Sequence, residues 1–209
     1  MDTTARSVTT APPTAGADTR ARIVRTASTL MQRQGYDGTG IKQISTESGA
    51  THGSIYHFFP GGKQELAVAA IRLGGEEFAD ALREFLDRDQ DPAEAVVALA
   101  GRLAEGLRDS DWIDGCPVTA TALGTAGRAP DIQQAAAEAF AHWQEIVFAA
   151  LRRAGIPDAD ARDLARTIIG TLEGAELATQ VSKDDRPLRA AGRHLAQLIN
   201  LYRPGNTGL

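Results

Sequence analysis

The side chains best suited to hydrogen-bonding chemistry are concentrated in one stretch, ATHGSIYHFFPGGKQEL, which spans residues 50–66. It contains two of the four histidines of the chain, three aromatic residues and, after a Pro-Gly-Gly break, a lysine. Hydroxyl, imidazole and ammonium groups are side-chain groups that contact phosphate oxygens and base edges in protein–DNA complexes. We therefore predict that this stretch binds DNA.

Two short helices must position these side chains. The spacing predicts one helix over about 41–48, which stops at Gly49, and a second over about 51–57, which stops before a proline. Gly49 stands where the chain must leave the first helix in a left-handed conformation, which glycine adopts without steric penalty. Helix, glycine-containing turn and helix form the helix-turn-helix pattern. Together with a preceding helix they can close a small core, whose members would be Ile23, Ala27, Leu30, Ile44 and Ile55.

The second short helix is predicted to present its polar face outward. Thr51 and His52 lie at its N-terminus, the end that meets base edges and phosphates in this motif. Gly53 permits close backbone approach, while Tyr56 and His57 can donate to phosphates, which fixes register without reading sequence. The predicted DNA-contacting residues are Thr39, Lys42, Ala50, Thr51, His52, Gly53, Tyr56, His57 and Lys63.

The alternative is that the aromatic residues form core and the histidines are solvated. We favour the core for Phe58 and Phe59, because phenylalanine has no polar group to offer a DNA backbone and is usually buried. Tyr56 and His57 fall on the exposed helical face, so for them we favour a DNA contact. Lys63, at the start of the following helix, adds a cation where the helix dipole already favours anions.

The charge distribution is asymmetric. The chain carries a net charge of −5, yet residues 18–72 hold seven Lys/Arg and four Asp/Glu, a surplus of +3, whereas residues 73–209 carry −8. A modestly basic segment on an acidic body is consistent with nucleic-acid binding. A surplus of this size is also within sampling variation, so charge alone does not decide the matter. An architectural binder that is indifferent to sequence would need a much more basic surface.

The stretch GTGIKQISTESGATHGSIYHFFPGGKQEL resembles the DNA-binding signature of the TetR/AcrR family of bacterial repressors, with the match covering about residues 20–66. GSIYHFFPGGKQELA, with GCPV further on, is similar to the branch that contains the lincomycin- and flavonoid-responsive repressors. The usual paired tyrosines are Tyr56 and His57 here, and the turn to Lys63 is one residue longer than usual. The resemblance implies a C-terminal ligand-binding domain, a homodimer formed by the last two long helices, and repression rather than activation.

Proline and glycine punctuation divides the chain into about nine helices, and no segment alternates as a strand would, so the fold is predicted to be all-α. The expected divisions are a disordered tail at 1–17, a helix-turn-helix domain at 18–66, a ligand-binding and dimerisation domain at 67–202, and a tail at 203–209. A long helix over about 63–87 joins the two domains. Gly74 and Gly75 lie in its middle, either for tight packing against a neighbouring helix or as a bend point.

Both tryptophans lie in the second domain, near other residues that could line an apolar cavity with a few polar groups, the expected form of a small-molecule site. The predicted ligand-binding residues are Trp112, Cys116, Thr119, Phe140, Trp143, Val147 and Glu173. The alternative is that the tryptophans merely fill core. Glu176, on the same helix as Glu173, is expected to be solvated.

Cys116 has two opposed interpretations. It could be a redox sensor or nucleophile with a pKa lowered by a helix N-terminus and raised by Asp114. No second cysteine exists to resolve an oxidised form, so we favour a small buried or cavity-lining thiol. A rival class, a helical enzyme using Cys116 and His142, requires these two side chains to lie within hydrogen-bond reach.

Small-residue and apolar stripes predict a dimer. Gly170, Gly174 and Ala178 repeat every four residues and leave a groove for close helix approach. The last helix carries an apolar stripe at 188, 191, 195 and 202. Two such helix pairs can form a four-helix interface, and closed twofold symmetry is the commonest oligomer. The alternative is that both stripes belong to the core of one chain.

Several classes of protein are excluded by the sequence. No apolar run approaches the length of a membrane span, and the N-terminus lacks the apolar core of a signal peptide. One cysteine fits a reducing cytoplasm, and the scattered histidines show no metal-ligand spacing, so neither metal nor cofactor is expected. The predicted function is a ligand-responsive homodimeric repressor that binds a palindromic operator and is released by a small apolar or aromatic effector, which would act by moving the helix at 63–87.

Overall fold

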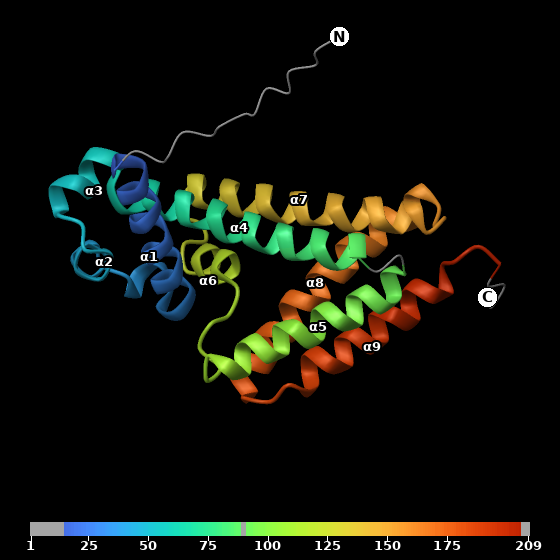
Figure 1. Cartoon of the computed structure of the whole chain (residues 1–209). Coiled ribbons are helices and arrows are strands. Elements are labelled where there is room, and N and C mark those ends of the chain that lie inside the picture. Colours follow the sequence, from blue (N-terminus) through green and yellow to red (C-terminus); the bar gives the residue numbers. More distant parts are fainter. Residues whose placement is uncertain (1–14, 89–90, 206–209) are drawn as a thin grey trace, which may run out of the picture.

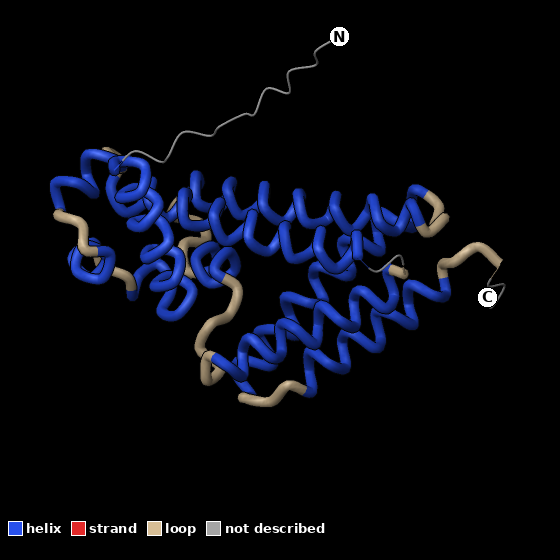
Figure 2. Tube along the Cα trace, in the orientation of Figure 1, coloured by secondary structure: helices blue, strands red, loops and turns tan. Residues whose placement is uncertain are grey.

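The computed structural model describes residues 15–88 and 91–205, and in these ranges the chain is all-helical, as the sequence predicted (Figures 1 and 2). The helices of the described residues are α1 (Ala15–Gly38), α2 (Ile41–Ser48), α3 (His52–Phe58), α4 (Gly62–Arg88), α5 (Pro92–Asp109), α6 (Pro117–Leu123), α7 (Pro130–Arg153), α8 (Asp158–Ser182) and α9 (Arg186–Leu201). Helix α1 begins before the expected boundary at 18; the rest of the predicted N-terminal tail, and most of the C-terminal one, lie outside the described residues.

Local signals fix most helix boundaries. Gly35 has φ 70° and ends the regular part of α1, and Gly49 has φ 64° and caps α2. Asp91 accepts a hydrogen bond from the Ala93 amide and precedes a proline at the first helical position, which is the expected N-terminal arrangement of α5. Prolines also open α6 and α7.

Helices α1, α2 and α3 form one end of the molecule, far from α9 (Figure 1). Their shared core contains the five residues predicted for it and Phe59, all buried. Phe58 is half-buried and packs against this core. Helix α6 contacts α1, α4 and α7, so it lies between the three-helix end and the rest of the chain.

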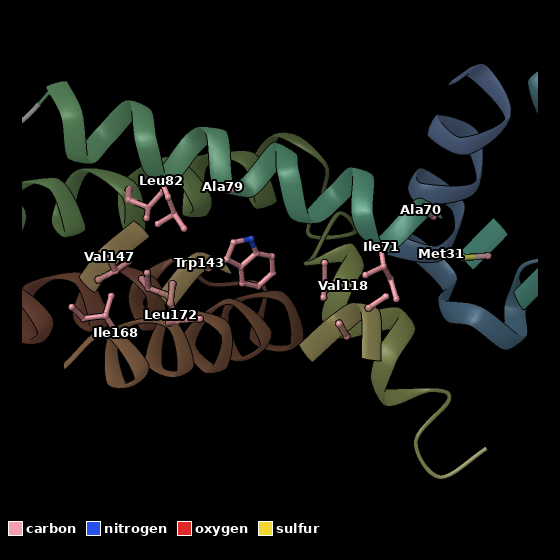
Figure 3. Packing of buried hydrophobic residues seen from close by; sticks show 14 of the residues in the cluster. Met31, Ala70, Ile71, Ala79, Leu82, Val118, Trp143, Val147, Ile168 and Leu172 are labelled. Carbon is pink, nitrogen blue, oxygen red and sulfur yellow. The ribbon is translucent and has the colours of Figure 1, made fainter. Parts of the chain in front are cut away.

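Two long helix pairs build the body. Helix α4 packs along α7, α5 packs along α9, and α8 contacts both α7 and α9 (Figure 1). Trp143 occupies the centre, with Leu82 of α4 on one side and Leu172 of α8 on another (Figure 3). Its side chain is fully buried, and its ring lies 4.8 Å from Phe78 and 4.9 Å from Phe140 between centroids. None of the described helices is long and apolar enough to cross a membrane.

The adjacent glycines of α4 lie at close helix contacts. A Cβ added at Gly74 would lie 2.5 Å from Cγ of Pro117, and one added at Gly75 would lie 3.0 Å from Cβ of Ala139. The carbonyl oxygen of Gly75 also accepts a 2.8 Å hydrogen bond from Nε1 of Trp143. Tight packing therefore accounts for both glycines without a bend point.

The two stripes predicted for dimerisation differ in exposure. Leu188 and Leu195 of α9 are buried, because α9 turns that stripe towards α5 and α8 of its own chain. These two residues of the α9 stripe are therefore core of their own chain, whereas Ala191 is half-buried and Tyr202 is 41% exposed; a role of α9 in dimerisation stays a prediction. The α8 stripe is exposed, and an added Cβ at Gly170 or Gly174 would meet no atom within 4 Å. The α8 stripe is thus exposed along its whole length, whereas the α9 stripe is only partly exposed.

Candidate nucleic-acid interface and effector cavity

The turn between α2 and α3 is held by short-range hydrogen bonds. The Gly49 amide donates a hydrogen bond to the carbonyl of Thr46, and the hydroxyl of Ser45 donates to the carbonyl of Ala50 at 2.6 Å. Thr51 is the N-cap of α3, where its hydroxyl accepts from the Ser54 amide at 3.1 Å. These bonds set the direction of α3 relative to α2, as a helix-turn-helix requires.

One face of α3 is open to solvent and the other is anchored in the core. Ile55 is fully buried, and Tyr56 is 52% exposed. The exposed predicted DNA contacts in this region are Lys42, Thr51, His52, Gly53, Tyr56 and His57. The structure thus brings six of the nine predicted residues to an accessible surface formed by α2 and α3.

Two predicted DNA contacts, Thr39 and Ala50, have buried side chains. Thr39 is 0% exposed, and its hydroxyl donates to the carbonyl of Gly35 at 2.8 Å, where it secures the end of α1. Ala50 is 7% exposed, and its backbone groups are engaged by Ser45 and Ser48. Thr39 secures the end of α1 and Ala50 the turn between α2 and α3, and neither side chain belongs to the exposed surface of α2 and α3.

Lys63 is half-buried beside the three-helix end. Its Nζ lies 4.2 Å from the centroid of the Tyr36 ring, a cation–π arrangement. Partial burial lowers the pKa of the Lys63 ammonium, and neighbouring Asp37 acts in the opposite direction. A contact between Lys63 and a DNA phosphate remains a prediction. On binding DNA, the ammonium group would either leave the Tyr36 ring or contact the phosphate while it stays on the ring.

A central cavity of about 410 Å³ lies between the three-helix end and the body. Its walls come from α1, α4, α5, α8 and the loop before α6. We call this space the central cavity; its lining residues are Gln32, Gly74, Glu77, Phe78, Ala81, Arg102, Leu103, Gly106, Leu107, Asp114, Gly115, Cys116, Pro117, Glu173 and Glu176. Apolar side chains and a few polar groups converge there, as in small-molecule sites.

The polar wall of the central cavity is built from α8 and the start of α6. The hydroxyl of Thr119 donates to Oε2 of Glu173 at 2.5 Å. Burial raises the pKa of the Glu173 carboxyl, and hydrogen bonds from Thr119 and Cys116 partly oppose that rise. Burial, and then the neighbouring Glu173, raise the pKa of Glu176 to about 8. Both carboxyl groups therefore hold protons more readily than solvated glutamates do, Glu176 above all.

Glu176 contradicts the sequence expectation that it is solvated. It is 9% exposed and lies on the side of α8 that faces the central cavity. The sequence of α8 could not reveal that Glu176 is buried. A glutamate on a largely apolar helix usually indicates the solvent-exposed face of that helix. The physical cause is the position of α8, which is covered by α7 and α9 and turns Glu176 inward.

The predicted ligand-binding residues separate into two groups. Cys116 and Glu173 line the central cavity, and Thr119 bonds to Glu173 behind that wall. Trp143 is core and touches Phe78, which lines the cavity. The others do not line it: Phe140 packs on Trp143, Val147 faces a separate small apolar void, and Trp112 lies half-buried with φ 64°.

The central cavity reaches directly to α1. Gln32 contributes to its lining from α1, and the next residue, Arg33, forms a two-bond ion pair with Asp114 at 2.6 and 3.0 Å. Near the end of α1, Asp37 pairs with Arg128, between α6 and α7. The cavity wall and the helix that carries α2 and α3 are therefore mechanically connected.

The hydrogen bond between Cys116 and His142 that the enzyme alternative requires is not formed. His142 is bonded through Nε2 to a guanidinium nitrogen of Arg83 at 2.6 Å and lies 4.0 Å from Glu76. Cys116 interacts instead with Thr119 and Glu173, and burial raises the pKa of its thiol well above its ordinary value. The thiol is therefore protonated and unreactive as a nucleophile. In residues 15–88 and 91–205 no group of three His, Cys, Asp or Glu side chains could hold a metal ion.

A helix-turn-helix unit with an exposed second helix, carried on a helical body with a cavity, defines a class of protein: the helix-turn-helix transcriptional regulators. Residues 23–70 match the bacterial regulatory proteins of the tetR family, and residues 92–194 match the C-terminal domain of LmrA/YxaF-like transcriptional regulators. The chain belongs to the TetR family.

Curated relatives and solved structures agree with this assignment. The HTH-type regulator YxaF of Bacillus subtilis is 33% identical over 186 residues, which cover 89% of this chain and 97% of YxaF. LmrA of the same organism is 33% identical over 171 residues, covering 82% and 91%. A TetR transcriptional regulator from Chloroflexus aurantiacus superposes with a TM-score of 0.77 at 27% identity, over 90% of this chain and 97% of that one.

Sequence reasoning missed most of the cavity wall. Gln32, Phe78 and Leu103 come from three helices that are distant in sequence, and none belongs to a local motif. The usable signals were the predicted residues Cys116 and Glu173 and the glycine at 74, since a glycine within a helix indicates close approach by another element.

Proposed function

We propose that this protein is a ligand-responsive homodimeric repressor that binds a palindromic operator and is released by a small apolar or aromatic effector. It would act in the cytoplasm, with residues 18–66 as the DNA-binding domain and 67–202 as the effector-binding and dimerisation domain. Its similarity to LmrA and YxaF supports placing it in the branch of lincomycin- and flavonoid-responsive repressors.

The observation that carries the proposal is the exposed face of α3. His52 and Tyr56 are solvent-accessible, whereas Ile55 between them is locked in the three-helix core. A rigid helix with its polar face outward and its N-terminus free is suited to the major groove. His52 would read base edges, and Tyr56, His57 and Lys42 would hold phosphates.

Dimerisation is supported by the open face of α8. Leu177 and Val181 are 52% and 77% exposed, and they follow Gly170 and Gly174, which leave room for a second helix. An exposed apolar and small-residue face of this kind is typical of a helix that packs against another chain. In a twofold dimer the two α3 helices would enter successive major grooves about 34 Å apart.

Release would follow from differential contacts in the central cavity. An effector there would touch Gln32 of α1, Phe78 of α4 and Glu173 of α8 at once. The dimer would have two arrangements, one with the α3 helices spaced for successive major grooves and one without that spacing. An effector that binds the second arrangement more tightly than the first shifts the population towards the second. The Arg33–Asp114 ion pair would carry this change from the cavity wall to α1.

Footprinting tests the proposal. The protein should protect a palindrome upstream of its own or a neighbouring gene, and apolar or aromatic compounds should be screened for release of that footprint. Protection of a palindrome and its loss on effector addition support the proposal. Binding that covers all sequences equally would contradict it.

A further inference from the structure

We propose that the central cavity binds an organic cation, with an apolar or aromatic body against Phe78 and Leu103 and a protonated nitrogen at the carboxyl groups of Glu173 and Glu176. The inference rests on the proposed function in one respect only, namely that the bound cation is the effector that releases the repressor from DNA. The site itself is argued from the cavity, and it stands or falls separately.

Glu176 is the first support, because it is buried without a partner. Its side chain is 9% exposed, lines the cavity, and makes no hydrogen bond or ion pair with the residues described in 15–88 and 91–205; its carboxyl oxygens are open to the cavity and are not enclosed by the protein. Buried carboxyl groups in proteins are nearly always satisfied by a donor or a cation. A carboxyl group that lines an open space with no donor from its own chain therefore points to a donor that arrives with a ligand.

Glu173 is the second support, because it faces the same space from one helical turn earlier. Residues separated by three positions on a helix are neighbours on its surface. The Glu173 carboxyl group makes ionisation of Glu176 less favourable and so adds to the rise in the pKa of Glu176 that burial causes. One positive charge placed at both would remove that repulsion and supply the missing donor.

The charges around the cavity favour a cation over an anion. Four lining residues carry carboxyl groups, Glu77, Asp114, Glu173 and Glu176, and one carries a guanidinium, Arg102. Asp114 is already paired with Arg33. Arg102 is exposed at the rim and forms no ion pair among the described residues. The deep wall thus offers carboxyl groups without a competing protein cation.

The protons balance as follows. In the free protein Glu176 is largely protonated near neutral pH, since its pKa is raised to about 8. When a protonated amine binds, its N–H groups donate to the carboxylate form of Glu176, and the displaced proton passes to the buffer. The neighbouring ionisable groups, Glu173, Cys116, Glu77, Asp114 and Arg102, face the same space from α8, α4, α5 and the loop before α6. Binding therefore strengthens as pH rises towards 8.

Calorimetric titration of the full-length protein, without DNA, tests the inference with matched probes. The amines are benzylamine, 4-phenylbutylamine and 1-naphthylmethylamine. The neutral controls are the corresponding alcohols, in which a hydroxyl group replaces the ammonium group, and the anionic control is 1-naphthoic acid. We expect at least one amine to bind about tenfold or more tightly than its alcohol, since hydrogen bonds to charged groups are the strong ones. Proton release should appear as a buffer-dependent enthalpy.

Two variants locate the effect. Glu176→Gln, which closely mimics the protonated acid and so should stay folded, is expected to reduce the preference for the amine to roughly twofold or less. Glu105→Gln removes an exposed carboxyl group of α5 that does not line the cavity, and this variant should keep the preference. A melting curve of each variant checks that it is folded.

Three results would overturn the inference: no amine in the panel binds below millimolar concentration, the alcohols or the acid bind as tightly as the amines, or Glu176→Gln keeps the full preference. Operator binding is measured in parallel and separates this inference from the proposed function. If the operator is bound but no amine preference is found, the cation site alone fails. If amines bind and the operator is never recognised, the repressor proposal alone fails.

Discussion

Replacing Glu176 with glutamine should change how the stability of the protein depends on pH. The folded-state pKa of Glu176 is raised to about 8 from an ordinary value of 4.5. Between these two values the folded state holds a proton that the unfolded state has released, so the free energy of unfolding falls as pH rises. Below about pH 4.5 Glu176 is protonated in both states and does not lower the free energy of unfolding. Above about pH 8 it is ionised in both states, and the full cost of burying the carboxylate lowers the free energy of unfolding.

The size of this effect follows from the shift. Each pKa unit corresponds to about 1.4 kcal/mol, so the raised pKa sets an upper limit of roughly 5 kcal/mol. Solvent that enters the central cavity stabilises the ionised carboxylate and reduces the penalty, so we expect a change of about 2–4 kcal/mol between pH 5 and pH 9. Glu176→Gln has no ionisable group at this position and should lose that decline.

Urea unfolding of both proteins at matched concentration, from pH 5 to pH 9, measures the difference directly. Titrating groups far from the cavity contribute similarly to the two proteins, so subtracting the curves isolates Glu176 together with its coupling to Glu173 and Cys116. The variant should gain stability relative to the natural sequence as pH rises, whereas Glu105→Gln should run parallel to the natural sequence. Parallel curves for Glu176→Gln would refute the burial that the structure assigns to this carboxyl group.

Three further substitutions test packing and DNA recognition. Gly74→Ala should lower stability by about 1–3 kcal/mol despite better helix propensity, because its Cβ would lie 2.5 Å from Cγ of Pro117; an unchanged or raised melting temperature would contradict the packing explanation. Lys63→Ala should weaken binding to all DNA sequences alike and reduce the log–log salt slope by roughly one for each phosphate that the lysine no longer neutralises, and salt titrations with an unaltered slope would count against it. His52→Ala should change operator preference by about 1–3 kcal/mol at one base position, whereas a uniform loss across operator variants would make His52 a backbone contact.

The helix-turn-helix was predictable because its determinants are local. Gly49, the cap at Thr51 and the buried Ile55 lie within a few residues of one another, so their spacing alone defines α2, the turn and α3. The burial of Thr39 was not predictable in this way. Its position before α2 is local, but the packing against α1 that covers its side chain is tertiary.

The central cavity was poorly predictable because its wall is assembled from distant segments. Gln32 and Glu173 are brought together by the packing of α1, α6 and α8, which no local pattern encodes. The stripe on α9 illustrates a second limit. Apolar periodicity shows that one face of a helix is packed against another element. The same sequence pattern arises whether that element is α5 of the same chain or a helix of another protomer.

The central claim, that a dimer places two α3 helices in successive major grooves, is tested most directly by varying operator spacing. Binding of the full-length protein is measured by fluorescence anisotropy on the footprinted palindrome and on a copy with about five base pairs, half a helical turn, inserted between the half-sites. We expect the insertion to lower affinity to near that of unrelated DNA, because one α3 then faces the wrong side of the duplex. Equal affinity for both operators at the same salt concentration would contradict the claim.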